Sequence, residues 1–194
     1  MTNIYGKRPP LVALTLEELL QKEIPERNNL LSPWLPSQGL CMIYSSRGLG
    51  KTWMALAIAH AVASNDSFLS WETGSAEGVL YIDGEMPMAV MQERLAQIEG
   101  STSKEIIAPF SIITPDAQEY GIPDLSTIDG QERVEKLITD ETKLIVMDNI
   151  STLIRTGKEN EGESWLPVQE WVLRLRSRGK TVLFIHHSGK GGQQ

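Results

Sequence analysis

Short apolar runs alternate with amphipathic stretches along most of this 194-residue chain. Runs rich in Val, Ile, Leu, Tyr and Phe predict buried strands at 40–45, 79–83, 110–113, 144–148 and 181–185. A helix is predicted at 51–64, directly after the first strand. Continuous apolar strands that alternate with amphipathic helices favour an α/β fold with a mostly parallel sheet, covered by helices on both faces. We therefore expect a three-layer αβα architecture.

Three further helices are predicted by apolar residues at 3.6-residue spacing. The residues expected on their inner faces are Met88, Met91, Leu95 and Ile98 in the first helix, Val134, Leu137 and Ile138 in the second, and Val168, Trp171, Val172 and Leu175 in the third. Asp129 with Glu132 predicts a capped start of the second helix, and Gly179 predicts the end of the third. A long polar loop is expected at 154–163.

The region before the first strand is predicted to be an N-terminal segment that precedes the core domain. Thr15 and Glu18 form a capping box that predicts a short helix. The residues expected to face inward from this helix are Leu16, Leu19 and Leu20. Residues 25–39 contain prolines and are interpreted as a connecting segment, with Trp34 and Leu35 as its anchors. We therefore divide the chain into a lead-in over residues 1–29 and a core domain over residues 30–194.

Charge and cysteine content narrow the classes of function. The formal net charge is −7 and the isoelectric point is about 5.0, so a large interface with double-stranded DNA is not expected. A small basic channel built from loops is still compatible with this charge. The single cysteine, Cys41, is expected to be a small buried apolar residue, and it excludes a disulfide within the chain, which fits a reducing cytoplasm. No apolar stretch approaches the roughly 18 residues of a membrane-spanning helix, so we expect no membrane partner.

Residues 45–52 read Ser-Ser-Arg-Gly-Leu-Gly-Lys-Thr, between an apolar strand and a helix. This is the setting of a phosphate-binding loop, or Walker A motif, whose backbone N–H groups face the phosphates of ATP. Lys51 is expected to reach the β- and γ-phosphates, and Thr52 is expected to bind Mg²⁺. The expected nucleotide-binding residues are Ser46, Arg47, Gly48, Leu49, Gly50, Lys51, Thr52 and Trp53.

Ser45 stands where the first glycine of such a loop is usual. The departure is mild if this position only turns the chain, and costly if the backbone there needs a positive φ. The alternative interpretation of the segment is an ordinary strand-to-helix turn without a ligand.

Polar residues follow the other main strands at the point where each strand ends. Asp83-Gly84-Glu85 follows the second strand, Asp148-Asn149 the fourth, and His186-His187 the last. The carboxyl ends of parallel strands meet at one edge of a sheet, and ligands bind there. We therefore expect these groups to converge with the phosphate loop.

Each of these groups has an expected role and a simpler alternative. Asp148 would end a Walker B strand and bind the Mg²⁺ shell, or it would only cap a loop. Glu85 would be the general base for the attacking water, or a solvated turn residue. Asp83 would share that role or hydrogen-bond the turn. His186 and His187 point to opposite sides of a strand, so one would contact the γ-phosphate and the other would be structural. His60 is expected to be a packing or surface residue.

Together these motifs resemble the core of RecA-like P-loop NTPases. Val79–Glu85 is similar to the strand-and-glutamate segment of that superfamily, and Ile185–Lys190 resembles the corresponding segment of plasmid RepA-type hexameric helicases and related phage and mobile-element ATPases. The resemblance covers about residues 30–190, and it implies a homo-oligomeric ring with His187 as the γ-phosphate sensor. Arg155–Trp165 is similar to the polar loop that follows Walker B in these ATPases. We count Glu85, Lys51 and His187 as expected catalytic residues, and His186 among the expected nucleotide contacts.

RecA-like cores normally continue with further strands and an arginine finger that reaches the neighbouring subunit. This chain ends seven residues after His187. We therefore expect a fragment of a longer protein, with slow hydrolysis.

The resemblance favours an ATP-driven, helicase-type motor of replication or repair that acts on single-stranded DNA. The loop cations that could contact the DNA are Arg155, Lys158 and Lys190, although each also fits a solvated loop charge. The alternative is a nucleotide-dependent regulatory or partner-binding switch that ignores DNA. A small-molecule kinase ranks third, because no Arg-rich lid is found and Glu85 favours hydrolysis. Trp34 and Tyr5 are the candidates for stacking on adenine.

Overall fold

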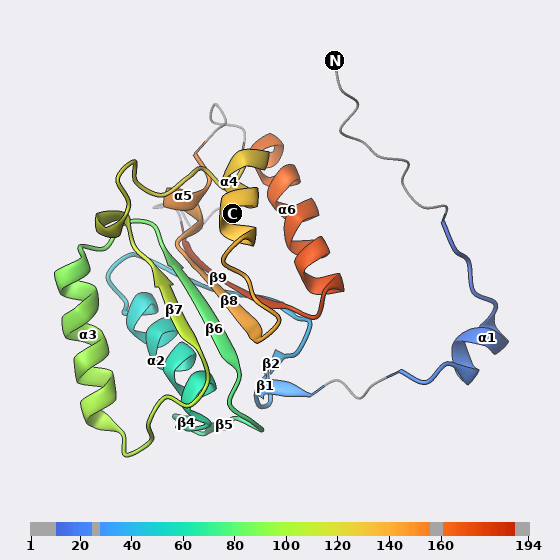
Figure 1. Ribbon diagram of the computed structural model, residues 1–194, viewed down its shortest axis with the longest axis horizontal. Helices are drawn as coiled ribbons and strands as arrows, with labels where there is room; N and C mark the ends of the chain where they lie inside the picture. The colour runs from blue at the N-terminus through green and yellow to red at the C-terminus, as the bar shows by residue number, and fades with distance from the viewer. Residues whose placement is uncertain (1–10, 25–27, 156–160, 189–194) are drawn as a thin grey trace.

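The computed structural model describes residues 11–24, 28–155 and 161–188, without the side chains of residues 161–164. Its centre is a sheet of five strands in the order β3-β9-β8-β6-β7, and every pair in this sheet is parallel (Figure 1). The strands are β3 (Leu40–Ser45), β6 (Gly78–Asp83), β7 (Phe110–Ile113), β8 (Thr142–Asp148) and β9 (Thr181–His187). All five predicted strands are therefore confirmed.

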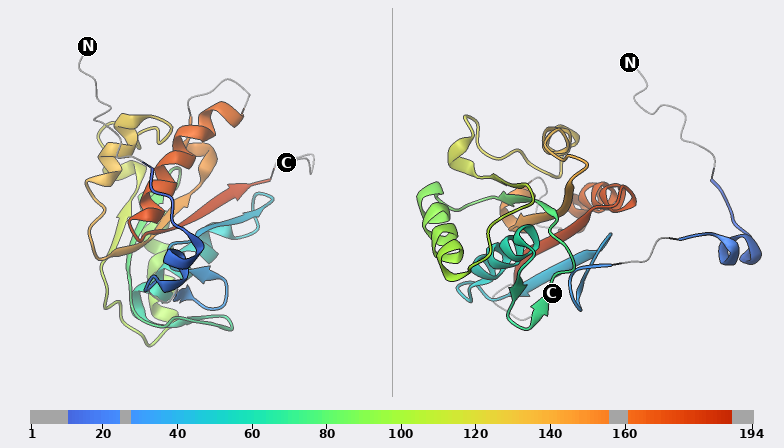
Figure 2. Two further views of the ribbon diagram at one scale, coloured as in Figure 1. Left: turned by 90° about the vertical axis from the view of Figure 1, so that its right-hand side faces the viewer. Right: turned by 60° about the horizontal axis from the view of Figure 1, so that its bottom comes forward.

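Helices cover both faces of this sheet (Figures 1 and 2). The helices on one face are α2 (Lys51–Ser64) and α3 (Met88–Ser101). Those on the other face are α4 (Ile128–Glu135), α5 (Ile150–Leu153) and α6 (Glu161–Ser177). The chain thus has the three-layer αβα fold that its pattern of apolar runs predicts.

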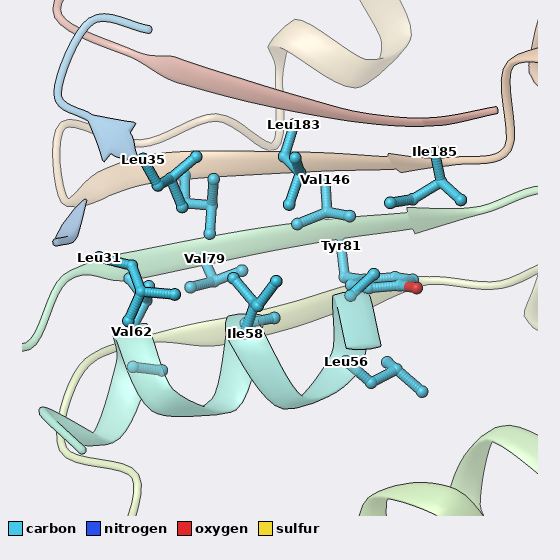
Figure 3. Packing of buried hydrophobic residues seen from close by; sticks show 14 of the residues in the cluster. Leu31, Leu35, Leu56, Ile58, Val62, Val79, Tyr81, Val146, Leu183 and Ile185 are labelled. Carbon is cyan, nitrogen blue, oxygen red and sulfur yellow. The ribbon is translucent and has the colours of Figure 1, made fainter. Parts of the chain in front are cut away.

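Alternation along the strands divides the core into two clusters. On β6, Val79 and Tyr81 pack toward α2, whereas Leu80 and Ile82 pack toward the opposite layer. The neighbouring strands β8 and β9 alternate in the same way, and Figure 3 shows the side chains of the α2 face. Both faces are buried, which explains why these strands are apolar at successive positions.

Two short antiparallel pairs accompany the sheet. They are β1 (Asn29–Leu31) with β2 (Leu35–Pro36), and β4 (Ser67–Phe68) with β5 (Trp71–Glu72). Leu35 is fully buried, and the ring of Trp34 packs edge-on against Trp71 with 5.2 Å between centroids. Both predicted anchors of this segment therefore contact the core. A short 3₁₀ helix, η1 (Pro115–Ala117), follows β7.

β3 forms one edge of the sheet. It pairs with β9 on one side, and no other described strand pairs with it. Cys41 is only half-buried in this strand and packs against the core, in contrast to the expected full burial. The alternate side chains Leu40, Met42 and Tyr44 are exposed. Within the described part of the chain, the strand that leads into the phosphate loop therefore lies at the edge of the sheet and carries an exposed apolar row.

The short helix α1 (Leu16–Gln21) begins as expected but packs differently from the prediction. Thr15 and Glu18 form the complete capping box. The expectation that Leu16, Leu19 and Leu20 face inward is wrong, because all three are exposed and α1 contains no buried residue. Figure 1 shows α1 apart from the sheet. A capping box specifies where a helix begins, but it contains no information about what the helix packs against.

Four other local predictions need correction. Met88, expected on the inner face of α3, is exposed at the start of this helix. The N-cap of α4 is Thr127, whose side chain accepts the N–H of Gly130, and not Asp129. Leu137 lies beyond the end of that helix and is exposed. α6 begins at Glu161, so part of the loop expected at 154–163 is helical, and residues 156–160 lie outside the described part. The buried stripe that includes Val168 and Trp171 provides the packing that stabilises this helix.

Among the described residues, no helix has the length and apolar character needed to cross a membrane.

We expect the triple variant Leu16→Ala, Leu19→Ala and Leu20→Ala to leave the unfolding free energy of the domain unchanged, because these side chains of α1 are exposed. Leu31→Ala is the contrast, since Leu31 is fully buried and the loss of its side chain should cost about 2–5 kcal/mol. Urea unfolding followed by circular dichroism measures both changes. A lower unfolding midpoint for the triple variant would show that α1 packs on the domain.

Candidate functional site

Parallel pairing brings four strand ends to one edge of the sheet. Ser45 at the end of β3 is the register partner of His187 on β9, and Asp83 on β6 is the partner of Asp148 on β8. The loop after Ser45 leads directly into α2. The expected convergence of the phosphate loop with these polar strand ends is therefore present in the structure.

The phosphate loop needs its glycines at two positions. Gly48 and Gly50 have φ values of +83° and +79°, a region that L side chains rarely adopt. Ser45, by contrast, is the last residue of β3 and has no positive φ. Serine in place of the usual first glycine is therefore the mild departure, because the backbone there is extended.

Lys51 folds back over the loop. Its Nζ donates to the carbonyl oxygens of Ser45 and Ser46 at 2.9 and 2.8 Å, and to the Ser45 hydroxyl at 3.2 Å. Burial lowers the pKa of the ammonium, and the nearby carboxylate of Asp148 opposes that shift. α2 has neither a side-chain N-cap nor an acidic residue in its first turn, so the positive end of its dipole faces the loop uncompensated.

Asp148 is a buried carboxylate that accepts a hydrogen bond from the hydroxyl of Tyr81 on Oδ2 at 2.7 Å. Burial raises the pKa of Asp148, and the hydroxyl groups of Tyr81 and Thr52 act against this shift. Thr52 and Asp148, the two residues expected to bind Mg²⁺, therefore lie near each other.

Asp83 and Glu85 have different environments although they are two residues apart. Asp83 is buried, and its carboxylate accepts the backbone N–H of Met86 at 2.9 Å and that of Glu85 at 3.5 Å. Glu85 is about half exposed, with Oε1 lying 3.9 Å from Nε2 of His187. Of the two alternatives for Asp83, these contacts fit the one in which it hydrogen-bonds the turn that carries Glu85.

The two histidines on β9 face opposite sides of the sheet, as predicted. His187 lies beside Glu85, and burial together with the charge of Lys51 lowers its pKa. His186 follows Ile185, a residue of the α2 face, and so points toward the opposite layer. No hydrogen bond or ion pair joins the side chain of His186 to the described loop residues, and its role as a nucleotide contact stays a prediction. Nδ1 of each ring is buried without a hydrogen-bond partner.

The aromatic candidates for the nucleotide have other partners. Trp53 lies under the guanidinium of Arg94, whose Cζ is 5.2 Å from the ring centroid. Trp34 packs on Trp71, which follows the C-terminal end of α2, whereas the phosphate loop precedes its N-terminal end. These contacts do not support Trp34 as the residue that stacks on adenine. Tyr5, the other candidate, lies outside the described residues.

Of the remaining expected loop residues, Ser46, Arg47 and Leu49 are exposed beside the two glycines. His60 is a packing residue: it is buried between α2 and α3, and its Nε2 lies 2.7 Å from Oε2 of Glu99.

One residue of the site escaped the sequence analysis. Tyr81 was interpreted only as an apolar member of its strand, although a tyrosine in a fully buried strand needs a partner for its hydroxyl. The signal was a polar atom in an otherwise continuous apolar run that ends at the edge where ligands bind. Asn149 was named among the polar strand ends but was given no role of its own; it is buried, and its Oδ1 has no hydrogen-bond partner.

These residues fit a magnesium-bound nucleoside triphosphate. The oxygen ligands of Thr52 and Asp148 suit Mg²⁺. The ammonium of Lys51 now donates to loop oxygens that phosphate oxygens could replace. The buried unpaired atoms of Asn149 and His187 also leave hydrogen-bonding capacity at this edge.

Comparison with known proteins supports this interpretation. Residues 7–193, nearly the whole chain, match a family model described as AAA domain. No curated protein matches the chain.

Asp83 should make folding stability depend on pH. Burial raises its pKa from the ordinary 3.8 to about 6, so the folded chain binds more protons than the unfolded chain between these values. The stability that this group contributes is therefore present below about pH 4 and is lost as the pH rises through about 6. In Asp83→Asn this pH dependence disappears.

The free energy of unfolding of the natural chain minus that of Asp83→Asn should fall by on the order of 2 kcal/mol from pH 4 to pH 7. Urea titrations across this range measure it, and groups shared by both chains largely cancel in the difference. A difference that does not change with pH would mean that Asp83 titrates normally.

Proposed function

The chain belongs to the AAA domain family of P-loop ATPases, and we propose that it hydrolyses ATP at the strand-end site with Glu85 as the general base. The observation that carries this proposal is the position of Glu85, which is half exposed and lies 3.9 Å from His187 at the edge where the loop begins. A carboxylate that is accessible at this edge can accept a proton from water, whereas the buried Asp83 and Asp148 are engaged with donors of their own.

The proposed binding mode follows from the contacts of the loop. The backbone N–H groups of residues 46–52 and the ammonium of Lys51 would bind the phosphates. Thr52 and Asp148 would hold Mg²⁺, which neutralises the charge on the phosphate oxygens when bound. Lys51 would exchange the carbonyl oxygens of Ser45 and Ser46 for phosphate oxygens.

Glu85 and His187 would act as a pair. Glu85 would orient the attacking water and take its proton. The ring of His187, near the charge of Lys51, would donate a hydrogen bond to the terminal phosphate and sense its loss. Because Nε2 of His187 already faces Glu85, a change at the phosphate would also reach the base.

We extend the proposal to a helicase-type motor that acts on single-stranded DNA and assembles as a homo-oligomeric ring. Its support is the resemblance of Ile185–Lys190 to plasmid RepA-type helicases. Of the three candidate DNA contacts, Lys158 and Lys190 lie outside the described residues.

A second candidate function is favoured by the contacts of Arg155. Its guanidinium donates to the carbonyl of Ile122, and its backbone N–H donates to Asp124 at 3.1 Å. With these contacts, Arg155 holds the segment after α5 in place, and its guanidinium is less available to bind the phosphate backbone of DNA. This observation fits a nucleotide-dependent switch that is read by a protein partner and not by DNA.

Glu85→Gln should bind ATP as tightly as the natural chain but hydrolyse it at least roughly 100-fold more slowly, because the amide cannot accept the proton. Equilibrium binding and steady-state phosphate release measure the two effects. Glu105→Gln is the matched control, since Glu105 is exposed and precedes β7, so it lies toward the opposite, amino ends of the strands. Normal turnover in Glu85→Gln would remove Glu85 from the catalytic role.

Steady-state hydrolysis with and without single-stranded DNA separates the two candidate functions. A DNA-coupled motor should turn over several-fold faster with DNA, and a switch should show the same slow rate in both conditions. Lys51→Ala is the control, because the loss of the loop ammonium should abolish nucleotide binding and with it any turnover. Hydrolysis that persists in Lys51→Ala would come from a contaminating enzyme.

A further inference from the structure

Tyr81 connects the hydrophobic core to the strand-end site. It lies on β6, is fully buried, and belongs to the cluster that packs under α2. Figure 3 shows its ring beside Leu56 and α2, with the hydroxyl oxygen directed toward the carboxyl ends of the strands. That hydroxyl donates a hydrogen bond to Oδ2 of Asp148 at 2.7 Å, and this bond fixes one oxygen of the carboxylate.

We propose that Tyr81 is a positioning residue for Mg²⁺, acting through Asp148: its hydroxyl occupies one carboxylate oxygen and aims the carboxylate at the hydroxyl of Thr52. This inference rests on the proposed function, because it takes Thr52 and Asp148 as the metal-binding residues. Tyr81 itself would contact neither the metal nor the nucleotide.

The geometry of the two strands supports this role. Tyr81 is the register partner of Val146, which lies two residues before Asp148, so all three side chains point to the α2 face. The tyrosine ring extends along the strand and spans this two-residue offset. The same face carries Thr52 at the first turn of α2, near enough for its hydroxyl to lower the pKa of Asp148. The carboxylate is therefore held by a donor anchored in the core and lies near the hydroxyl on the helix.

The hydrogen bond also has an electrostatic consequence. A carboxylate that is nearly fully buried loses its hydration, and a donor to its charged form offsets part of that loss. A metal-binding carboxylate must be charged and correctly oriented, and the groups that hydrogen-bond such ligands orient them in other metal sites. Phenylalanine would fill the same space without needing a partner, so packing alone does not require the hydroxyl.

The test is isothermal titration of a non-hydrolysable ATP analogue, first in EDTA and then at increasing Mg²⁺. In Tyr81→Phe, the Mg²⁺ concentration for half-maximal tightening of binding should rise by roughly 10-fold or more, with unchanged affinity in EDTA. Tyr120→Phe is the matched control, because it removes a hydroxyl from an exposed tyrosine and should change neither quantity. Thermal unfolding checks that Tyr81→Phe is folded.

A second variant tests whether Tyr81 acts through Asp148. Asp148→Asn should itself weaken the Mg²⁺ effect, and adding Tyr81→Phe to that background should weaken it no further. The inference is overturned by an unchanged Mg²⁺ requirement in Tyr81→Phe, by an equal loss of affinity with and without Mg²⁺, or by additive effects in the double variant. If the natural chain shows no Mg²⁺ effect, or Asp148→Asn retains it, the proposed metal site fails as well.

Discussion

The parallel hydrogen-bond ladder between β3, β9, β8 and β6 is the constraint on which the site depends. Its register makes Ser45 the partner of His187 and Asp83 the partner of Asp148. Apolar side chains on both faces fix this register, since a slip of one residue would exchange the two faces of a strand. Tyr81 would then leave the α2 layer and lose Asp148. The packing of the core and the geometry of the polar edge are therefore set by the same ladder.

Burial of charge shapes the rest of the site. Lys51, Asp83 and Asp148 are all buried, and each has specific partners: loop carbonyls for the ammonium, backbone N–H groups for Asp83, and the Tyr81 hydroxyl for Asp148. These hydrogen-bond partners offset part of the free-energy cost of taking charged groups out of water. Glu85, in contrast, is open to solvent. The three buried charged groups are therefore held in place by hydrogen bonds, whereas the carboxylate of Glu85 is accessible to water.

The sequence predicted the elements whose signal is local and missed those that depend on distant contacts. The five strands and the glycine-bearing loop follow from continuous apolar runs and a short motif. The contact between Tyr81 and Asp148 joins residues 67 positions apart, and no periodicity reveals it. The prediction that the leucines of α1 face inward was wrong for the same reason, because an apolar stripe on a helix does not identify the surface that it packs against. Thr127 was overlooked as a cap because Asp129, two residues later, has a similar capping chemistry.

The exposed edge of β3 has a consequence for assembly. Among the described strands, β3 pairs only with β9, and the row Leu40, Met42 and Tyr44 is exposed along it. The edge of a sheet is a template for one more strand. A strand that paired there would lie directly beside the one that ends in the phosphate loop. If a ligand changed the affinity of this edge for such a strand, the strand would change the affinity for the ligand by the same factor.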